Sequence, residues 1–226
     1  MDIVAPHEPV FDKPRAGKSE CREFQLFETL KFANGRFVLL ERHLKRLGDA
    51  ARYFGFHCDL AHIRRQLHEY GHTLTGESYR VRLLLSKTGE SALDASPLHR
   101  LPGLLFVALT TDPVSRRDWS LYHKTTVRDV YERHRSIRRD ADEVLLWNEE
   151  EEVTEFTTGN LVAELGGIRW TPSVDSGLLA GTMRADLLEK GEIRERPISK
   201  RELADASHLW LINSVRGWVP VRLLKR

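Results

Sequence analysis

The sequence of 226 residues is short of several features that define whole classes of protein. It has two cysteines, Cys21 and Cys58, too few for a disulfide framework or a cysteine-based metal cluster. No run of about 18 apolar residues occurs, so we expect no membrane-spanning helix. Lys and Arg total 35 against 33 Asp and Glu, which gives no strong field for nucleic acid. A cytoplasmic protein without disulfides, a metal site, membrane contact or nucleic-acid partners is expected.

The first 22 residues also lack a feature, the apolar core of a signal peptide. They contain Pro6, Pro9 and Pro14 and charges of both signs. Such a segment is typical of a loose arm rather than of a leader or an anchor. We therefore expect residues 1–22 to be a flexible N-terminal arm and ordered structure to begin near residue 23.

The composition of the remainder supports a sizeable core, since 41% of the chain is hydrophobic and 30% is charged. Alternating apolar residues predict strands, and apolar residues three or four apart predict helices. In the first half these patterns predict strands at 24–30 and 37–40 around a turn at Asn34-Gly35, a helix at 41–54, a helix from Asp59 through Tyr70, a strand at 79–86, a polar loop at 87–101 and a strand at 104–109.

The second half has many short strands and few helices. Strands are predicted at 143–147, 153–156, 160–164, 168–171, 193–198 and 208–213, with a short helix at 183–190. The pattern changes near Pro113, where we place a boundary. The prediction is an α+β fold of two domains, a small α/β domain at 23–112 and a larger, strand-rich domain at 113–226.

Four features scattered along the chain could carry chemistry. Lys124 lies in the stretch Leu-Tyr-His-Lys-Thr-Thr, and Glu155 follows 31 residues later. A glycine-rich loop leads into the helix start at Thr182, where backbone amides favour phosphate. Arg46 is a further cation. Each feature alone has a commoner explanation, because single lysines, glutamates and arginines are usually solvated and glycine-rich loops are frequent.

Taken together, the four features resemble the class IV (fold type IV) pyridoxal-phosphate family, which includes branched-chain and D-amino-acid aminotransferases and aminodeoxychorismate lyase. The resemblance is strongest to the lyase and covers nearly the whole chain after residue 24. The stretches that carry it are Leu26-Phe27-Glu28-Thr29-Leu30, His43-x-x-Arg46-Leu47, His123-Lys124-Thr125-Thr126 with Arg128 and Tyr131, and Asn213-Ser214-Val215-Arg216-Gly217-Trp218-Val219-Pro220.

The resemblance implies a role for each matching residue. Lys124 is expected to bind pyridoxal 5'-phosphate as a Schiff base, and Glu155 is expected to face the ring nitrogen. The phosphate ligands it implies are Arg46, the amides of Thr182 and Met183, and the hydroxyl of Ser214. Thr29 occupies the position where lyases carry threonine and branched-chain transaminases carry glycine, and is expected to handle a proton. A homodimer is also implied.

A small anionic substrate needs cations in the site. Arg80 and Arg82 alternate on one predicted strand face, so both could point into the cleft, although a solvated strand edge is an equal alternative. Arg216 is a further candidate. Two departures from the family pattern are evident: no Gly-Asp-Gly stretch precedes Phe27, and Tyr131 is too far from Lys124 to be assigned the bond to the cofactor's phenolate oxygen.

The activity that the resemblance implies is elimination of pyruvate from 4-amino-4-deoxychorismate to give 4-aminobenzoate for folate synthesis. Lys124 would remove a proton from the substrate, and aromatisation would make the step favourable. Two alternatives remain. One is an aminotransferase acting on a branched-chain or D-amino acid. The other is a non-catalytic partner of the enzyme that makes aminodeoxychorismate, which would have no need of Lys124, Glu155 and Arg46 together.

Overall fold

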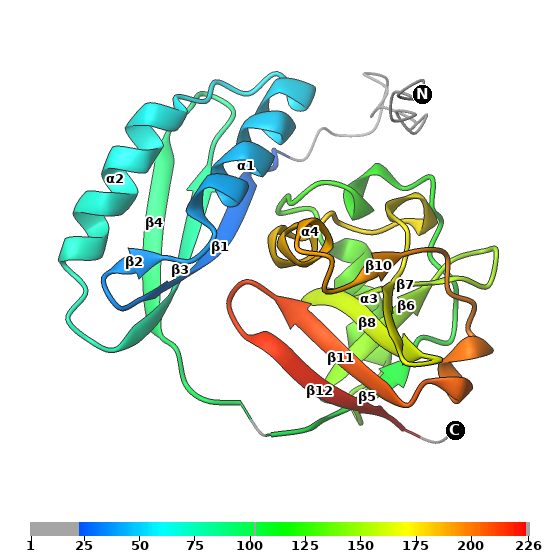
Figure 1. The fold of residues 1–226 in the computed structure, drawn as a ribbon. Coiled ribbons are helices and arrows are strands. Elements are labelled where there is room, and N and C mark those ends of the chain that lie inside the picture. The colour runs from blue at the N-terminus through cyan, green and yellow to red at the C-terminus, as the bar shows by residue number, and fades with distance from the viewer. Residues whose placement is uncertain (1–22, 102, 225–226) are drawn as a thin grey trace, which may run out of the picture.

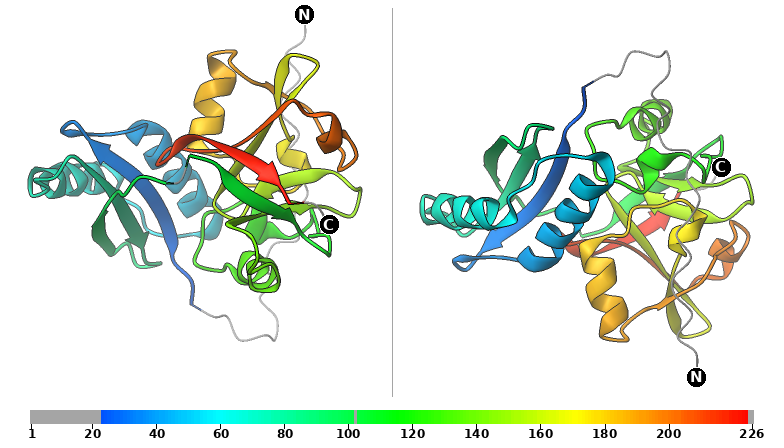
Figure 2. Two further views of the ribbon diagram at one scale, coloured as in Figure 1. Left: turned by 90° about the horizontal axis from the view of Figure 1, so that it is seen from below. Right: turned by 90° about the horizontal axis from the view of Figure 1, so that it is seen from above.

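The computed structural model describes residues 23–101 and 103–224, and they form two parts that lie side by side (Figures 1 and 2). The predicted N-terminal arm lies outside the described residues. The first part is a four-stranded antiparallel sheet in the order β2-β1-β3-β4. Its elements are β1 (Leu26–Ala33), β2 (Arg36–Phe37), α1 (Leu40–Phe54), α2 (Leu60–His72), β3 (Ser78–Leu85) and β4 (Ser91–Pro97).

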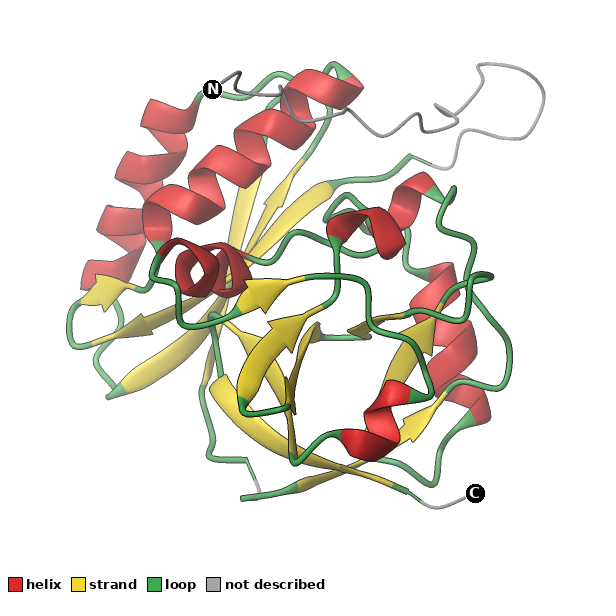
Figure 3. Cartoon of the chain, turned by 45° about the vertical axis from the view of Figure 1, so that its right-hand side comes forward, coloured by secondary structure: helices red, strands yellow, loops and turns green. Residues whose placement is uncertain are grey.

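Both helices of this part cover one face of its sheet (Figure 3). Leu44 and Leu47 of α1 and Leu26 and Leu30 of β1 are fully or almost fully buried in the shared core. The 3.6-residue spacing of the apolar side chains in α1 explains why they all reach this core. Asp59 caps α2 as predicted, accepting a 2.9 Å hydrogen bond from the His62 amide.

The predicted hairpin is confirmed, but its second strand is shorter than expected. Asn34 and Gly35 both have positive φ (51° and 71°), as a two-residue hairpin turn of the I′ kind requires. β2 ends at Phe37 because the chain turns into α1 at Leu40, so the strand predicted at 37–40 is wrong.

The second part is an eight-stranded sheet in the order β10-β9-β8-β11-β12-β5-β6-β7. An additional pairing of β7 with β8 closes six of these strands into a barrel. Its elements are β5 (Leu105–Leu109), α3 (Asp129–Ile137), β6 (Glu143–Trp147), β7 (Val153–Phe156), β8 (Gly159–Leu165), β9 (Ile168–Thr171), α4 (Thr182–Glu189), β10 (Arg194–Glu195), β11 (His208–Asn213) and β12 (Gly217–Leu223), with 3-10 helices at Trp119–Leu121, Val174–Ser176 and Glu202–Asp205.

The structure differs from the predicted strands in three further places: β4 and β12 were not predicted, and β10 is shorter than expected. The expected loop at 87–101 contains β4, whose small and polar residues have weak strand propensity but pair with β3 over seven positions. β12 was not predicted, and it contains Pro220, a residue that usually argues against a strand. The strand expected at 193–198 shrinks to the two residues of β10.

The division between the two sheets falls earlier than predicted. β5 pairs with β12 and β6 of the larger sheet rather than with the small one. The chain therefore passes from one sheet to the other in residues 98–104, before the boundary expected at residue 113. None of the helices in the described part of the chain is both long and apolar enough to span a membrane.

Candidate active site between the two sheets

Lys124 lies on a short extended segment that pairs with the start of β1. The Phe27 amide donates to the Lys124 carbonyl oxygen (3.0 Å), and the Thr126 amide donates to the Gln25 carbonyl oxygen (2.9 Å). The Lys124 amine stands 4.6 Å from the centre of the Phe27 ring. The backbone of this lysine is thus fixed to the small sheet, although the segment continues into α3 of the larger part.

The Lys124 amine has the electrostatic setting of a reactive lysine. Burial lowers its pKa to about 7, and the positive charges of Arg46 and Arg128 act in the same direction, while Glu28 and Glu155 oppose the shift. Among the described residues it makes no hydrogen bond or ion pair. A large share of the amine is therefore neutral near pH 7, able to act as nucleophile or base.

Glu155 is a buried carboxylate on β7, only 4% exposed. One oxygen accepts from the Tyr131 hydroxyl (2.8 Å) and the Leu179 amide (3.1 Å), and the other accepts from the Asn160 side chain (3.3 Å). Burial raises its pKa to about 7 despite these hydrogen bonds. A cationic group placed beside this carboxylate would restore its negative charge.

Tyr131, which the sequence alone leaves without a role, holds Glu155 in place. It lies in the first turn of α3, and the Arg128 guanidinium stacks 4.3 Å from the centre of its ring. Arg128 in turn donates to the Thr157 carbonyl oxygen (2.6 Å). The Tyr131 hydroxyl is therefore committed to Glu155 and supports that carboxylate.

Five polar side chains bond the two sheets together, and we call them the clamp. Arg46 donates through Nε and Nη2 to the two oxygens of Glu28 (2.8 and 2.6 Å). The His43 ring contacts Glu28 through Nδ1 (2.6 Å) and the hydroxyls of Ser214 and Thr182 through Nε2 (2.9 and 3.2 Å). The clamp thus joins β1 and α1 to α4 and the β11–β12 turn.

Burial and the neighbouring charges together determine which groups of the clamp are ionised. Glu28 is 1% exposed; burial works to raise its pKa, but Arg46 and His43 outweigh this and lower the pKa to about 2. Burial lowers the pKa of His43, although Glu28 opposes the shift. We therefore take Glu28 as ionised and His43 as neutral, with Arg46 as the main counter-charge. Nδ1 then donates to Glu28, and the single lone pair of Nε2 accepts from the Ser214 hydroxyl, the closer of the two.

Beside the clamp lies the N-terminus of α4, with its free backbone amides. Thr182 is its first residue, and a Cβ on the preceding Gly181 would lie 2.0 Å from the Asn160 side-chain oxygen. A larger residue here would have to displace Asn160 from its hydrogen bond to Glu155. Arg46 also donates to the Ala180 carbonyl oxygen (3.2 Å). A guanidinium, two hydroxyls and the amides of a helix start, including those of Thr182 and Met183, suit a phosphate group.

The open face of the small sheet carries three cations, Lys31, Arg80 and Arg82, which we call the cation face. Register places Thr29 opposite Arg82 and Lys31 opposite Arg80. The Arg82 guanidinium lies 4.7 Å from the centre of the Phe27 ring that Lys124 also contacts, and its Nε is buried without a partner. Arg82 and Thr29 thus lie near Lys124, whereas Arg80 lies one step further along the strand.

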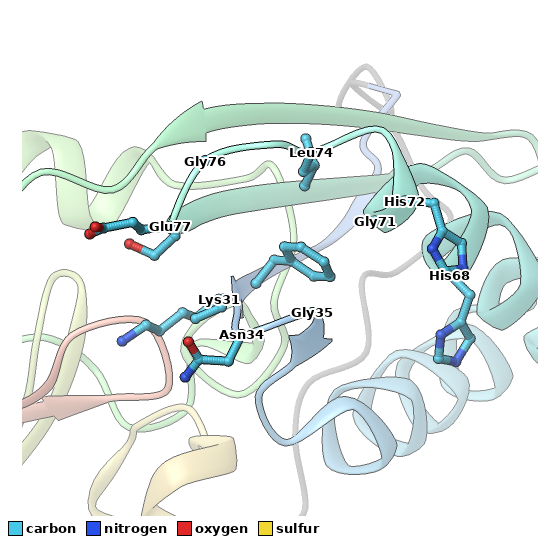
Figure 4. A pocket seen from close by; sticks show the side chains of 12 residues that line it. Lys31, Asn34, Gly35, His68, Gly71, His72, Leu74, Gly76 and Glu77 are labelled. Carbon is cyan, nitrogen blue, oxygen red and sulfur yellow. The ribbon is translucent and has the colours of Figure 1, made fainter.

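A hollow of about 670 Å³ lies away from Lys124. It is lined by the β1–β2 turn, the end of α2 and the start of β3, with Lys31 on its rim. In Figure 4 the side chains of Lys31 and Glu77 reach toward one side, and His68 and His72 stand on the other. No group of three or more His, Cys, Asp or Glu that could hold a metal ion occurs in residues 23–101 and 103–224.

Comparison with known proteins places this geometry in a family. The sequence profile of the class IV amino-transferase family matches residues 25–224. The chain belongs to the class IV aminotransferase family. Members are pyridoxal-phosphate-dependent enzymes, so the chain is an enzyme of this kind, a lyase or a transaminase, with the expected fold type IV architecture.

The relatives of this class IV chain divide between the two activities. A Schizosaccharomyces pombe protein with the provisional name aminodeoxychorismate lyase is 33% identical over 204 residues, 86% of this chain and 87% of that protein. A Mesorhizobium loti structure provisionally named an amino-acid aminotransferase is 35% identical, with a TM-score of 0.84, covering 89% of this chain and all of that one. The 4-amino-4-deoxychorismate lyase of Pseudomonas aeruginosa is 27% identical, with a TM-score of 0.78 over 93% of this chain and 89% of that one.

Proposed function

We propose that this chain is a 4-amino-4-deoxychorismate lyase, which eliminates pyruvate from its substrate and leaves 4-aminobenzoate. The observation that carries the proposal is that Lys124, Glu155 and the Arg46 of the clamp lie close enough for both partners to act on the pKa of the Lys124 amine. The amine rests against Phe27, which shares a strand face with Thr29. The relatives named as this lyase support it.

The residues present fit pyridoxal 5'-phosphate. Lys124 would bind it covalently, Glu155 would face its ring nitrogen, and Arg46, Ser214, Thr182 and the Met183 amide would hold its phosphate. When bound, the cofactor supplies an electron sink for negative charge that forms on the substrate carbon. The fit rests on the donor set itself, since the Arg46 guanidinium, the hydroxyls of Ser214 and Thr182 and the amides at the start of α4 are neighbours.

The chain's own residues would then move protons. The neutral Lys124 amine would take the proton from the substrate carbon that bears nitrogen. The bond between the neighbouring ring carbon and the ether oxygen would break, its electron pair leaving with that oxygen as the enolate of pyruvate. Thr29, which makes no side-chain hydrogen bond to a described residue, would assist delivery of a proton to that enolate. The ring left behind is aromatic, which drives the step forward.

An aminotransferase is the second candidate, favoured by the Mesorhizobium loti relative. The experiment that separates the two supplies aminodeoxychorismate without any keto acid and measures pyruvate with lactate dehydrogenase. The lyase releases pyruvate under these conditions, and Lys124→Ala should not. Amine transfer that requires a keto acid, with no pyruvate formed, would contradict the lyase and favour the transaminase.

A prior check concerns the cofactor alone. The purified protein should be yellow and lose that absorbance on treatment with borohydride, and a colourless protein that takes up no added pyridoxal phosphate would overturn the proposal. The same proposal includes a homodimer, measurable by sedimentation velocity, and a cytoplasmic role in supplying 4-aminobenzoate for folate synthesis.

A further inference from the structure

The outer end of the cation face has a charge arrangement that folding alone does not favour. Lys31 on β1 stands directly opposite Arg80 on β3. Like charges at directly opposed strand positions destabilise a sheet. Both side chains lie on the face of the sheet away from α1 and α2, because the alternating residues Leu30 and Val81 fill the helix-covered core. The pair thus faces outward from the core without contributing to it.

A third cation reaches the same place from the larger sheet. Arg216 lies in the β11–β12 turn and donates through Nη1 to the carbonyl oxygen of His99. The chain just before His99 runs beside the start of β3, where the Leu98 amide donates to the Ser78 carbonyl oxygen (3.0 Å). Arg80 is two residues further along β3, and its charge contributes to lowering the pKa of Arg216, after burial.

The turn that carries Arg216 is held rigidly. The Asn213 side-chain oxygen accepts from the Val215 and Arg216 amides (3.0 and 2.8 Å), and its nitrogen donates to the Thr158 carbonyl oxygen (3.1 Å). In Figure 4 the Lys31 side chain extends to the side on which this turn lies. Arg216 is therefore anchored before any ligand arrives, beside strands whose register fixes the positions of Lys31 and Arg80.

No carboxylate of the described chain neutralises these three cations. Glu77 precedes β3, and Asp94 on β4 stands opposite Arg82. No ion pair within 4 Å joins either acidic residue to Lys31, Arg80 or Arg216 in residues 23–101 and 103–224. Lys31 and Arg216 are half-buried. Removing a cation from water without a counter-ion costs free energy, and an incoming anion recovers it.

We propose that Lys31, Arg80 and Arg216 form an anion subsite, which binds a second carboxylate of the substrate and selects dianionic substrates over monoanionic ones. Arg82 and Thr29, one strand step nearer to Lys124 and roughly 7 Å from the Lys31–Arg80 pair, lie between the subsite and the reacting amine. The inference rests on the proposed function, because it assigns one end of the substrate to Lys124 and the other to the anion subsite.

The test uses two unreactive ligands of matched shape, 3-(carboxymethoxy)benzoate, a dianion, and 3-methoxybenzoate, a monoanion. Neither has an amine, so neither reacts with the cofactor. Isothermal titration calorimetry of each against the cofactor-loaded protein gives a ratio of dissociation constants. We expect the dianion to bind at least about tenfold more tightly, since it alone can fill the anion subsite.

Variants assign that preference to the three residues. Arg80→Gln and Arg216→Gln should each bring the ratio close to 1, Arg80→Lys should keep part of it, and Lys31→Gln should reduce it less. Arg65→Gln, a change at an exposed arginine of α2, is the matched control and should leave the ratio unchanged. The exposed Arg80 side chain makes no hydrogen bond or ion pair with a described residue, so Arg80→Gln should melt at the wild-type temperature. Arg216→Gln also loses the bond to the His99 carbonyl oxygen, so Arg80→Gln is the more decisive of the two variants.

The outcomes separate this inference from the proposed function. A ratio near 1 in the wild type, or a ratio that survives both glutamine variants, would overturn the subsite even if pyruvate is released from aminodeoxychorismate. A strong dianion preference lost in both variants, together with no pyruvate release, would support the subsite and refute the lyase.

Discussion

The clamp and the cation face are both rich in charge, but their charges are satisfied in opposite ways. In the clamp, Glu28, Arg46 and His43 bond to one another and to hydroxyls of the other sheet. On the cation face, Arg82 has a buried nitrogen without a partner, and Lys31 and Arg80 form no ion pair with a described residue. The paired groups join the two sheets, whereas the unpaired ones have no internal partner, and we propose that they bind the substrate.

This difference between the clamp and the cation face matches how long each proposed ligand stays bound: the cofactor remains, and the substrate exchanges. A cofactor that stays bound needs donors that keep their geometry in its absence, and internal hydrogen bonds give that rigidity. A substrate that comes and goes gains more from cations with no internal competitor, because it need not displace one. Substitutions in the clamp should therefore cost stability, and substitutions on the cation face should cost substrate binding.

The largest expected effect comes from Lys124→Met. Loss of the base should lower turnover by about 10³-fold or more. The folded pKa of this amine is about 7 against the usual 10.5, so burying its charge costs stability below pH 7, and the cost disappears as the pH rises through 10.5. The cofactor-free variant should thus be the more stable protein in urea at pH 6 and lose that advantage by pH 10. Equal stability at pH 6 would show that the amine is well solvated.

Glu28→Gln comes second and tests the clamp. It leaves Arg46 without its bidentate partner, and breaking such a buried pair costs about 3–5 kcal/mol. The pKa of Glu28 is about 2 in the folded protein, so its contribution is present above pH 4.5 and lost as the pH falls from 4.5 to 2.

Urea unfolding of the cofactor-free protein at pH 7 and at pH 3 measures both effects of Glu28→Gln. Glu41→Gln, which breaks the exposed pair of Glu41 with Arg64 (2.6 Å), is the control and should cost under about 1 kcal/mol. A loss equally small for Glu28→Gln would remove the distinction between the clamp and a surface ion pair.

Arg82→Gln comes third and should, unlike Glu28→Gln, weaken substrate binding without lowering stability. Its unsatisfied Nε costs free energy in the folded state, so the cofactor-free variant should be as stable as the wild type or slightly more so. The KM for the substrate should rise about 10- to 100-fold, as expected for the loss of a charged hydrogen bond. Steady-state kinetics and urea unfolding measure the two effects. A stability loss similar to that of Glu28→Gln would make Arg82 a structural residue.

Tyr131→Phe should have the smallest effect and tests the support of Glu155. Without the 2.8 Å hydrogen bond from this hydroxyl, the pKa of Glu155 rises further above 7, and more of the carboxylate becomes neutral. Turnover should fall about tenfold, and the acidic limb of its pH profile should move up by roughly one unit. Tyr70→Phe on α2 is the control. An unshifted profile would show that Glu155 does not depend on Tyr131.

Local patterns predicted those elements in which sequence and burial agree. α1 forms where apolar side chains recur at helical spacing, and Asn34-Gly35 forms a turn that requires positive φ at both residues. β4 escaped prediction because Ser91–Pro97 gains its strand conformation from pairing with β3, which is not encoded in its own residues. The early passage to the larger sheet has the same origin, since β5 is assigned to it by its partners β6 and β12.

The residues of the candidate site likewise fall into two groups, those found from the sequence and those revealed only by the structure. The resemblance found Lys124, Glu155, Arg46, Thr182 and Ser214, which stand in recognisable stretches. It gave no role to Glu28 or His43, whose contacts lie across large sequence separations, such as the 171 residues between His43 and Ser214. One sequence signal could have drawn attention to His43: it stands three residues before Arg46, so both lie on one face of a helix.

The sequence by itself determined the family, the residue types of the site and the elements whose apolar periodicity is strong, because these depend on neighbours within a few positions. Only the tertiary structure decided which polar groups are paired and which are left without partners. That outcome depends on burial and on distances between β1, α1, α4 and the β11–β12 turn, and these distances are set when the two sheets pack against each other.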